Sequence, residues 1–181
     1  MKISLIALAG LMLAIAGSAA TASQTIPAKA DDAKKLVGTW RLVSRNDTLA
    51  DGRSFVEPSL DADPLGYLMY DATGHVAVQL MRRNRTAADT QASSPSSQPS
   101  IAAPAALNGY EAYFGTYTVE ETGHTVTHHV EGALVPANVG KYLVRNYSFQ
   151  GAHDDRLALS LPLVESDGTK ATRTLVWERV K

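Results

Sequence analysis

Hydrophobic and polar positions alternate in short runs along most of the chain after residue 36, and Gly, Asp, Asn or Pro bounds each run. Alternation with a period of two predicts β-strands that bury one face. The strands expected on this basis are Thr39–Arg45, Gly66–Tyr70, His75–Met81, Tyr113–Val119, Thr125–Glu131, Tyr142–Gln150, Arg156–Val164 and Thr172–Val180. Only Asp31–Leu36, before the first strand, has a helix-like pattern.

The order of these segments indicates the fold class. Sequential strands separated by turns, with no helices between them, predict an antiparallel up-and-down meander. A meander of this length tends to close on itself, because closure removes the exposed strand edges. We therefore expect an all-β protein whose strands form an eight-to-ten-stranded barrel with little helix.

Two hairpins carry similar turn sequences, YDATGHVAVQLM from Tyr70 and VEETGHTVTHHV from Val119. In both, an acidic residue precedes X-Thr-Gly-His, which fits a type I turn followed by a glycine in the left-handed region. If the residues flanking each turn pair, Tyr67 faces Gln79, Met69 faces Ala77 and Thr116 faces His128.

This register assigns the side chains to two faces of the sheet. One face carries Tyr67, Met69, Gln79, Met81, Phe114, Thr116, Val126, His128 and Val130. The other carries Leu68, Tyr70, Val76, Val78, Leu80, Tyr113, Tyr117, Thr127, His129 and Glu131. The neighbours His128 and His129 therefore point to opposite faces, and the pattern leaves open which face lines the interior.

The segment 82–108 interrupts the alternation and is rich in Ser, Ala, Pro and Gln. Such a composition predicts a long mobile loop without a core of its own. Either it is a lid over the mouth of the barrel or it is a solvated insertion. Arg53–Asp63 is expected to be a second irregular connection.

The N-terminus has the layout of a secretory signal peptide. Lys2 precedes an apolar run, Ile3–Ala16, and small residues continue to Ala22. The apolar run is shorter than the roughly 20 residues that span a bilayer. We expect export to the periplasm or the extracellular space with cleavage after Ala22, for which Ala20 is the second-best site, rather than a retained membrane anchor. The mature chain then has a polar leader over residues 23–35 and a barrel domain over residues 36–181.

Composition narrows the function classes. Cleavage would leave 159 of the 181 residues and, by removing Lys2, a net charge of −2, without the basic cluster that nucleic-acid binding requires. The chain has no cysteine, so disulfides and thiol chemistry are excluded and burial alone must stabilise the fold.

Several strings resemble a known family. Gly38-Thr39-Trp40 near the start of the first strand and Trp177-Glu178-Arg179 in the last resemble the lipocalin and fatty-acid-binding superfamily. The strings GTWRLVS, DPLGYLMYDATGHVAVQLMRRNR, YEAYFGTYTV, TVTHHVEGALVP and LVWERV are together similar to the lipocalin-like domain family of bacterial exported and fungal proteins.

The resemblance implies a barrel around a small cavity, closed at one end by cation–π stacking of Arg179 on Trp40. It covers about Leu36–Lys181, and the sequence departs from it over 86–106, where family members usually carry a more charged, helix-forming stretch. It implies no settled reaction.

The candidate chemistry favours an interior site without metal or cofactor. His128 and His129 cannot share an ion because they point to opposite faces, and Gln79 and Thr116 are poor zinc ligands. There is no Gly-X-Ser-X-Gly elbow or phosphate-binding glycine loop. Catalysis by a nucleophile is therefore not expected.

Three function classes stay open: a binding protein, an enzyme, and a stress-related envelope protein that acts through protein contacts and would have a barrel interior packed solid with side chains. In the first, the barrel binds a small hydrophobic or amphipathic molecule, and an inward Arg145 holds its carboxylate. The residues proposed to bind the ligand are Tyr67, Met69, Gln79, Met81, Phe114, His128 and Arg145. In the second, the protein is a cofactor-independent isomerase, cyclase or hydratase that uses a histidine as general acid and base, either His128 with Tyr67 and Gln79 or His129 with Tyr117 and Glu131.

Overall fold

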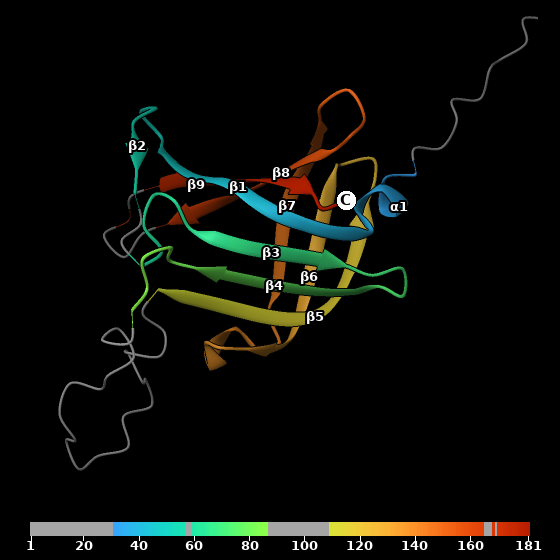
Figure 1. Ribbon diagram of the computed structural model, residues 1–181, viewed down its shortest axis with the longest axis horizontal. Helices are drawn as coiled ribbons and strands as arrows, with labels where there is room; N and C mark the ends of the chain where they lie inside the picture. The colour runs from blue at the N-terminus through green and yellow to red at the C-terminus, as the bar shows by residue number, and fades with distance from the viewer. Residues whose placement is uncertain (1–30, 57–58, 87–108, 165–167, 169) are drawn as a thin grey trace, which may run out of the picture.

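Antiparallel strands follow one another around a closed barrel (Figure 1). The computed structural model describes residues 31–56, 59–86, 109–164, 168 and 170–181. The strands are β1 (Gly38–Leu49), β2 (Ser54–Phe55), β3 (Leu65–Tyr70), β4 (His75–Met81), β5 (Tyr110–Glu120), β6 (Thr125–Ala133), β7 (Tyr142–Gln150), β8 (Arg156–Val164) and β9 (Lys170–Arg179). A short helix, α1 (Asp32–Leu36), precedes them, and a 3₁₀ turn, η2 (Pro136–Asn138), follows β6.

The barrel closes where the first strand meets the last. β1 pairs with β9 from Trp40↔Arg179 to Leu49↔Ala171 and with β3 on its other side, and from β3 to β9 each strand pairs with the next in sequence. Eight strands form the barrel, and β2 extends from the end of β1 through Asp47↔Phe55. The all-β meander predicted from the alternation is therefore confirmed. The sequence did not predict β2, because two residues are too few to show a period.

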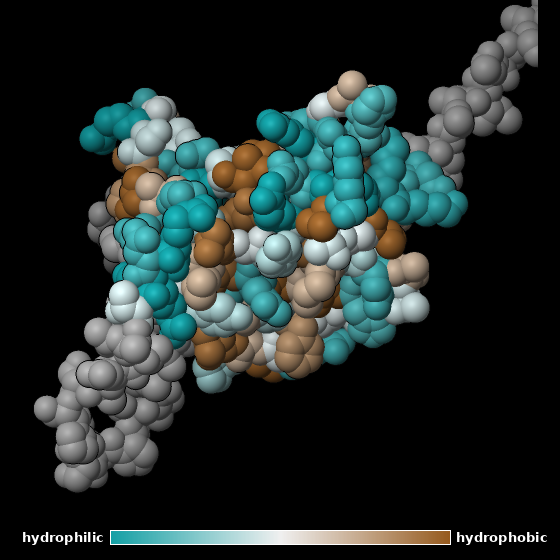
Figure 2. Space-filling view, viewed as in Figure 1, coloured by the Kyte–Doolittle hydropathy of each residue, from teal (hydrophilic) through white to brown (hydrophobic). Residues whose placement is uncertain are grey.

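The inner face of the barrel contains the hydrophobic core. Its buried side chains include Trp40, Leu68, Tyr70, Val76, Val78, Leu80, Tyr113, Val126, Val130, Tyr147, Leu157, Leu159, Leu175 and Trp177. On the outer face large apolar residues stand among polar ones, as Figure 2 shows for one side of the molecule. The face with Leu68 and Tyr70 is thus the inner one for β3 and β4.

The second hairpin corrects the predicted register. Tyr67 pairs with Gln79 and Met69 with Ala77, as predicted, but Thr116 pairs with His129, and His128 pairs with Tyr117. The first turn has its left-handed residue at Gly74, whereas the second turn is one residue longer and has it at His124. A shift of one residue turns every side chain of a strand to the opposite face. The prediction that His128 shares a face with Tyr67 and Gln79 is therefore wrong.

A bulge in β1 sets which of its polar residues point inward. Pairing with β9 shifts between Leu42 and Ser44, so that the buried positions change from Trp40 and Leu42 to Arg45 and Asp47. A bulge adds one residue to one strand and re-aims the side chains that follow. Here it brings a cation and an anion into the barrel.

Helix α1 closes one end of the barrel. Leu36 is fully buried, and the Trp40 indole Nε1 donates a hydrogen bond to the Leu36 carbonyl over 2.8 Å. The Arg179 guanidinium lies 4.1 Å from the centre of the Trp40 ring and donates to the Val37 carbonyl over 2.8 Å. The cation–π contact implied by the family resemblance is confirmed.

Gly38 makes this closure possible. Its φ of 139° is one that other residues rarely adopt, and a Cβ there would lie 2.6 Å from Arg179 Nη1. The glycine of the Gly-X-Trp string therefore leaves room for the arginine.

The predicted signal peptide and the loop within 87–108 lie outside the described residues. None of the helices in the described ranges is long and apolar enough to cross a membrane.

Candidate functional site

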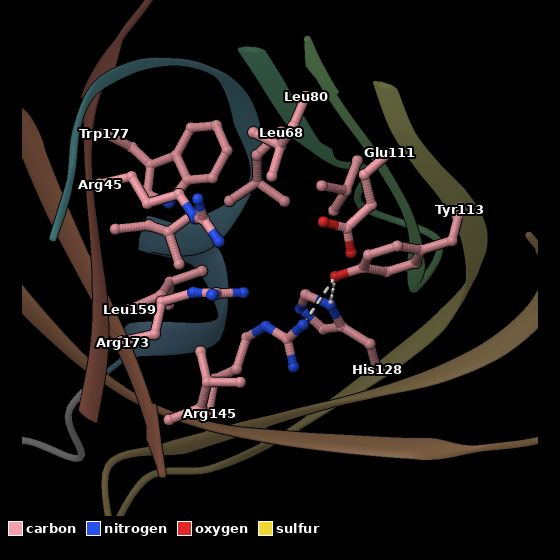
Figure 3. A pocket seen from close by; sticks show the side chains of 13 residues that line it. Arg45, Leu68, Leu80, Glu111, Tyr113, His128, Arg145, Leu159, Arg173 and Trp177 are labelled. Carbon is pink, nitrogen blue, oxygen red and sulfur yellow. Dashed lines mark hydrogen bonds between the residues drawn. The ribbon is translucent and has the colours of Figure 1, made fainter. Parts of the chain in front are cut away.

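An internal cavity of about 80 Å³ lies between the strands of the barrel (Figure 3). One part of its wall is apolar and consists of Leu68, Val78, Leu80, Leu159, Leu161, Leu175 and Trp177. The other part is polar and consists of Arg45, Glu111, Tyr113, His128, Arg145 and Arg173. The lining residues come from β1, β3 to β9, so the cavity depends on the closed barrel.

His128 is held between two tyrosines. Its Nε2 lies 2.7 Å from the Tyr70 hydroxyl and its Nδ1 lies 2.8 Å from the Tyr113 hydroxyl. The imidazole is fully buried. Burial, and secondly the nearby Arg145 cation, hold the pKa of His128 well below its usual value, so the ring is neutral near pH 7.

Arg145 extends from β7 to the same tyrosine. Its Nη2 donates to the Tyr113 hydroxyl over 3.2 Å, and its guanidinium carbon lies 5.9 Å from the centre of the Tyr113 ring. Burial raises the pKa of Tyr113 to about 12, although the positive charge of Arg145 acts in the opposite direction. The phenol is therefore protonated, and can donate a hydrogen bond, throughout the physiological range.

The other two arginines of the cavity surround a buried aspartate. Asp47, which is 2% exposed, accepts hydrogen bonds from Arg173 Nε over 2.8 Å and from Arg173 Nη2 over 2.6 Å. Arg45 Nη2 lies 3.8 Å from the same carboxylate. Two parallel bonds of this kind fix both side chains, and Asp47 balances one of the two positive charges in this part of the wall.

The charges and donors of the wall are not fully balanced. Three guanidinium groups stand against two carboxylates, Asp47 and Glu111, which leaves one positive charge in excess when His128 is neutral. Within the described ranges, the buried donors without a hydrogen-bond partner include Arg145 Nη1 and Trp177 Nε1. A buried donor without a partner costs about 1 to 3 kcal/mol, and more if it is charged. The cavity thus presents donors and positive charge to whatever occupies it.

The structure brings together two of the seven residues proposed to bind a ligand. His128 and Arg145 line the cavity. Tyr67, Met69, Gln79 and Phe114 are exposed, and Phe114 is the most exposed of them at 59%. Met81, at the end of β4, is half-buried and does not belong to the cavity wall. A molecule inside the barrel would not touch these five outer residues.

Sequence reasoning missed most of the polar wall. The sequence put Tyr113 on the other face of the sheet from His128, because the predicted register of the second hairpin was wrong by one residue. Arg173 alternates with the buried Leu175 and Trp177, and this spacing was available from the sequence. The inward direction of Arg45 depends on the bulge in β1, which no pattern in the sequence indicates.

The remaining histidines are not arranged around an ion. His129 is half-exposed and its ring stacks on Tyr142 with 4.6 Å between centres; it pairs with Thr116, whereas Tyr117 pairs with His128. In the part of the chain that the structure describes, no three residues of His, Cys, Asp or Glu are grouped to hold a metal.

The topology defines the class: an eight-stranded up-and-down barrel closed by the pairing of β1 with β9. The chain belongs to the lipocalin-like domain family, whose model matches residues 37–180. The resemblance stated from the sequence strings is confirmed. No curated protein matches the chain significantly.

Solved structures with similar folds include a redesigned β-barrel and bovine odorant-binding protein. The redesigned barrel is 15% identical with a TM-score of 0.37, and the match covers 82% of this chain and 95% of that one. Bovine odorant-binding protein in complex with a selenium-containing odorant is 13% identical with a TM-score of 0.40, over 81% and 71% of the two chains. A deswapped triple mutant of the bovine protein is 14% identical with a TM-score of 0.38, over 81% and 74%. Likeness at this level carries no inference about function.

Proposed function

We propose that the protein binds a small amphipathic molecule inside the barrel. The observation that carries the proposal is the cavity of about 80 Å³ with an apolar wall on one part and buried arginines on the other. Binding sites for small molecules combine an apolar lining with a few placed polar groups. This distribution favours a ligand with one polar group and an apolar remainder.

The cavity volume limits the size of the ligand. An apolar cavity of about 150 Å³ holds benzene, and the cavity here is about half as large. It fits a molecule of a few non-hydrogen atoms without rearrangement. A longer ligand would have to displace side chains of the wall.

The alternative of an acid–base enzyme has less support. A general base must present a nitrogen or oxygen to the substrate. Both ring nitrogens of His128 are within hydrogen-bonding distance of tyrosine hydroxyls, and His129 lies outside the cavity. His128 is better suited to hold Tyr113 in place than to exchange a proton with a bound molecule.

Binding is tested by calorimetry with small amphipathic compounds and by displacement of an environment-sensitive apolar dye. Leu159→Phe would fill part of the cavity, and we expect it to abolish binding. Val144→Phe is the matched control, because Val144 is 53% exposed on the outer face of the barrel. If Leu159→Phe binds the compounds as well as the wild type does, the site is not inside the barrel.

We also propose that the protein is exported, since the sequence of residues 1–22 has the three parts of a signal peptide. Cell fractionation and mass spectrometry of the full chain test this. We expect the mature protein outside the cytoplasm with Ser23 at its N-terminus. A charged substitution in the apolar run, Leu11→Arg, should keep the uncleaved chain in the cytoplasm, and an uncleaved cytoplasmic wild type would contradict the proposal.

A further inference from the structure

We infer that the polar part of the cavity is a receptor for the carboxylate of a short monocarboxylic acid, with Tyr113 and Arg145 as its two donors. The inference rests on the proposed function and names the chemical class of the ligand. It is derived from the hydrogen-bond inventory around His128, the charge of the wall and the volume of the cavity.

The inventory begins with the imidazole. A neutral histidine has one nitrogen that donates and one that accepts, so one of the two tyrosines donates to His128 and the other accepts from it. If Tyr113 donates to Nδ1, then Nε2 donates to Tyr70, and the Tyr70 hydroxyl must find another acceptor. Tyr70 is 2% exposed and does not line the cavity, and within the described ranges its hydroxyl bonds to His128 alone.

The opposite arrangement leaves no such orphan. Tyr70 donates to Nε2, and Nδ1 donates to the Tyr113 oxygen, which also accepts from Arg145 Nη2. The Tyr113 oxygen then has both lone pairs engaged, and its own hydrogen is left to donate. Because Tyr113 lines the cavity, that hydrogen is open to an acceptor inside it, and the Glu111 carboxylate of the same wall is the other acceptor on this side of the cavity. Burying an unpaired hydroxyl is unfavourable, so this second arrangement is preferred.

Arg145 supplies the second donor. Its Nη1 is buried without a partner in the described part of the chain, while Nη2 of the same guanidinium is bonded to the Tyr113 oxygen. The two unused donors therefore belong to groups 3.2 Å apart, and Figure 3 shows the guanidinium and the hydroxyl meeting at the wall of the cavity. Adjacent donors suit the two oxygens of a carboxylate.

The charge of the wall favours an anion over a neutral acceptor. Asp47 is engaged by Arg173 through two hydrogen bonds, so it does not compete for Arg145. One bound monoanion would cancel the excess positive charge of the wall, whereas a neutral ligand would leave it uncompensated. Glu111 is the other acid in the wall, and its charge opposes the binding of a carboxylate. The excess positive charge of the wall remains after Glu111 is counted.

The apolar part of the wall and the volume determine the rest of the ligand. Leucines and Val78 give an alkyl group no hydrogen-bond partner, so the tail must be apolar. The limited volume restricts the tail to a few carbons. A short straight-chain carboxylate, of the size of propionate or butyrate, meets all three conditions.

Isothermal titration calorimetry of the wild type with butyrate, butyramide and butylamine tests the class. Butyramide has the shape of butyrate without its charge, and butylamine has the opposite charge. We expect butyrate to bind at least about tenfold more tightly than butyramide, since hydrogen bonds to a charged group are the stronger ones, and butylamine not to bind.

Substitutions at the two donors test their roles. Arg145→Met should lower the affinity for butyrate about 10- to 100-fold and leave the affinity for butyramide within about threefold of that of the wild type. Tyr113→Phe should weaken butyrate in the same way. Arg156→Met is the matched control, because Arg156 is exposed on β8, and it should bind butyrate as the wild type does. The melting temperature of each variant shows that it is folded.

The outcomes separate this inference from the proposed function. If butyramide binds as tightly as butyrate, or if Arg145→Met loses both equally, the cavity binds a ligand but is not a carboxylate receptor. If neither compound nor any longer homologue binds to the wild type, the proposed function fails and the inference fails with it. Retention of butyrate binding by folded Arg145→Met would also overturn the inference.

Discussion

Arg145 lies half-buried in the polar part of the cavity wall, with one terminal nitrogen bonded to Tyr113 and the other, which is buried, without a partner in the described ranges. A buried cation of this kind is seldom explained by stability. Replacing buried charged groups by apolar ones of similar size is often neutral or stabilising. Its presence is better explained by a task that requires the charge.

We therefore expect Arg145→Met to melt at or above the temperature of the wild type when no ligand is present. Methionine fills a similar volume and removes the cost of the buried charge, although it also removes one hydrogen bond to Tyr113. Differential scanning calorimetry measures the difference. A destabilisation above about 2 kcal/mol would mean that the arginine has a structural role.

The pH dependence of stability should carry the signature of His128. Because burial lowers the pKa of His128 below the usual value of 6.5, the unfolded chain binds a proton below about pH 6.5 that the folded protein does not. Stability should be independent of this group above pH 6.5 and should decrease below it, by at most about 1.4 kcal/mol per pH unit.

Urea denaturation between pH 5 and 7.5 checks this slope, since most carboxylates begin to titrate only below that range. His128→Gln keeps a donor and an acceptor for the two tyrosines, and it should flatten the slope. His153→Gln is the control, because His153 is exposed. An unchanged slope in His128→Gln would assign the effect to other groups.

The sequence predicts the direction of a side chain best where the alternation of apolar and polar residues is continuous. Arg145 lies in an unbroken run on β7, where the sequence left open whether its side chain points inward or to solvent, and in the structure it lines the cavity. His128 follows a turn that is one residue longer than its twin, so its partners were assigned to the wrong face. The difference between Gly74 and His124 as the left-handed residue depends on the packing of the turns, which a shared Thr-Gly-His string does not reveal.

At the scale of elements, helix α1 is attached to the barrel by side chains rather than by a hydrophobic face alone. Arg179 donates to the carbonyls of Lys35 and Val37, and the Tyr147 hydroxyl donates to Asp32 Oδ2 over 3.0 Å. A helix of five residues is too short to be stable in isolation. These contacts are what keep it across the end of the barrel.

Arg179→Lys should separate charge from geometry at this closure. Lysine keeps the positive charge but cannot stack on Trp40 and bond to two carbonyls at once. We expect a loss of stability of about 1 to 2 kcal/mol, measured by thermal unfolding. Arg41→Lys is the control, because Arg41 is exposed and pairs with Glu178 on the same two strands, and its effect should be clearly smaller than that of Arg179→Lys. Equal effects of the two variants would mean that the geometry of the Arg179 guanidinium does not contribute to stability.

Elements were the level that the sequence predicted best. His75–Met81, Tyr142–Gln150 and Arg156–Val164 have the bounds that alternation and turn residues predicted. The family resemblance added the contact between Arg179 and Trp40, which no local pattern could have supplied. The bulge in β1 was missed because a bulge is decided by the strand on the other side of the pair.

The whole molecule has one continuous core inside one closed sheet, and its two tryptophans are both part of it. Because all eight barrel strands contribute to one shared core, unfolding should be a single cooperative transition. We expect the urea curves from tryptophan fluorescence and from far-UV circular dichroism to coincide. A fluorescence change that precedes the loss of strand signal would show that the end closed by α1 opens separately.

The seam between β1 and β9 has a further consequence. Because the two strands are antiparallel, the beginning of the barrel at Trp40 lies directly beside its end at Arg179. A short linker could join them, and the chain could be opened instead at another hairpin, such as the one between β7 and β8. Such a circular permutant would keep every strand pair and every residue of the cavity wall. The order in which the chain visits the strands would then be separable from the chemistry that they enclose.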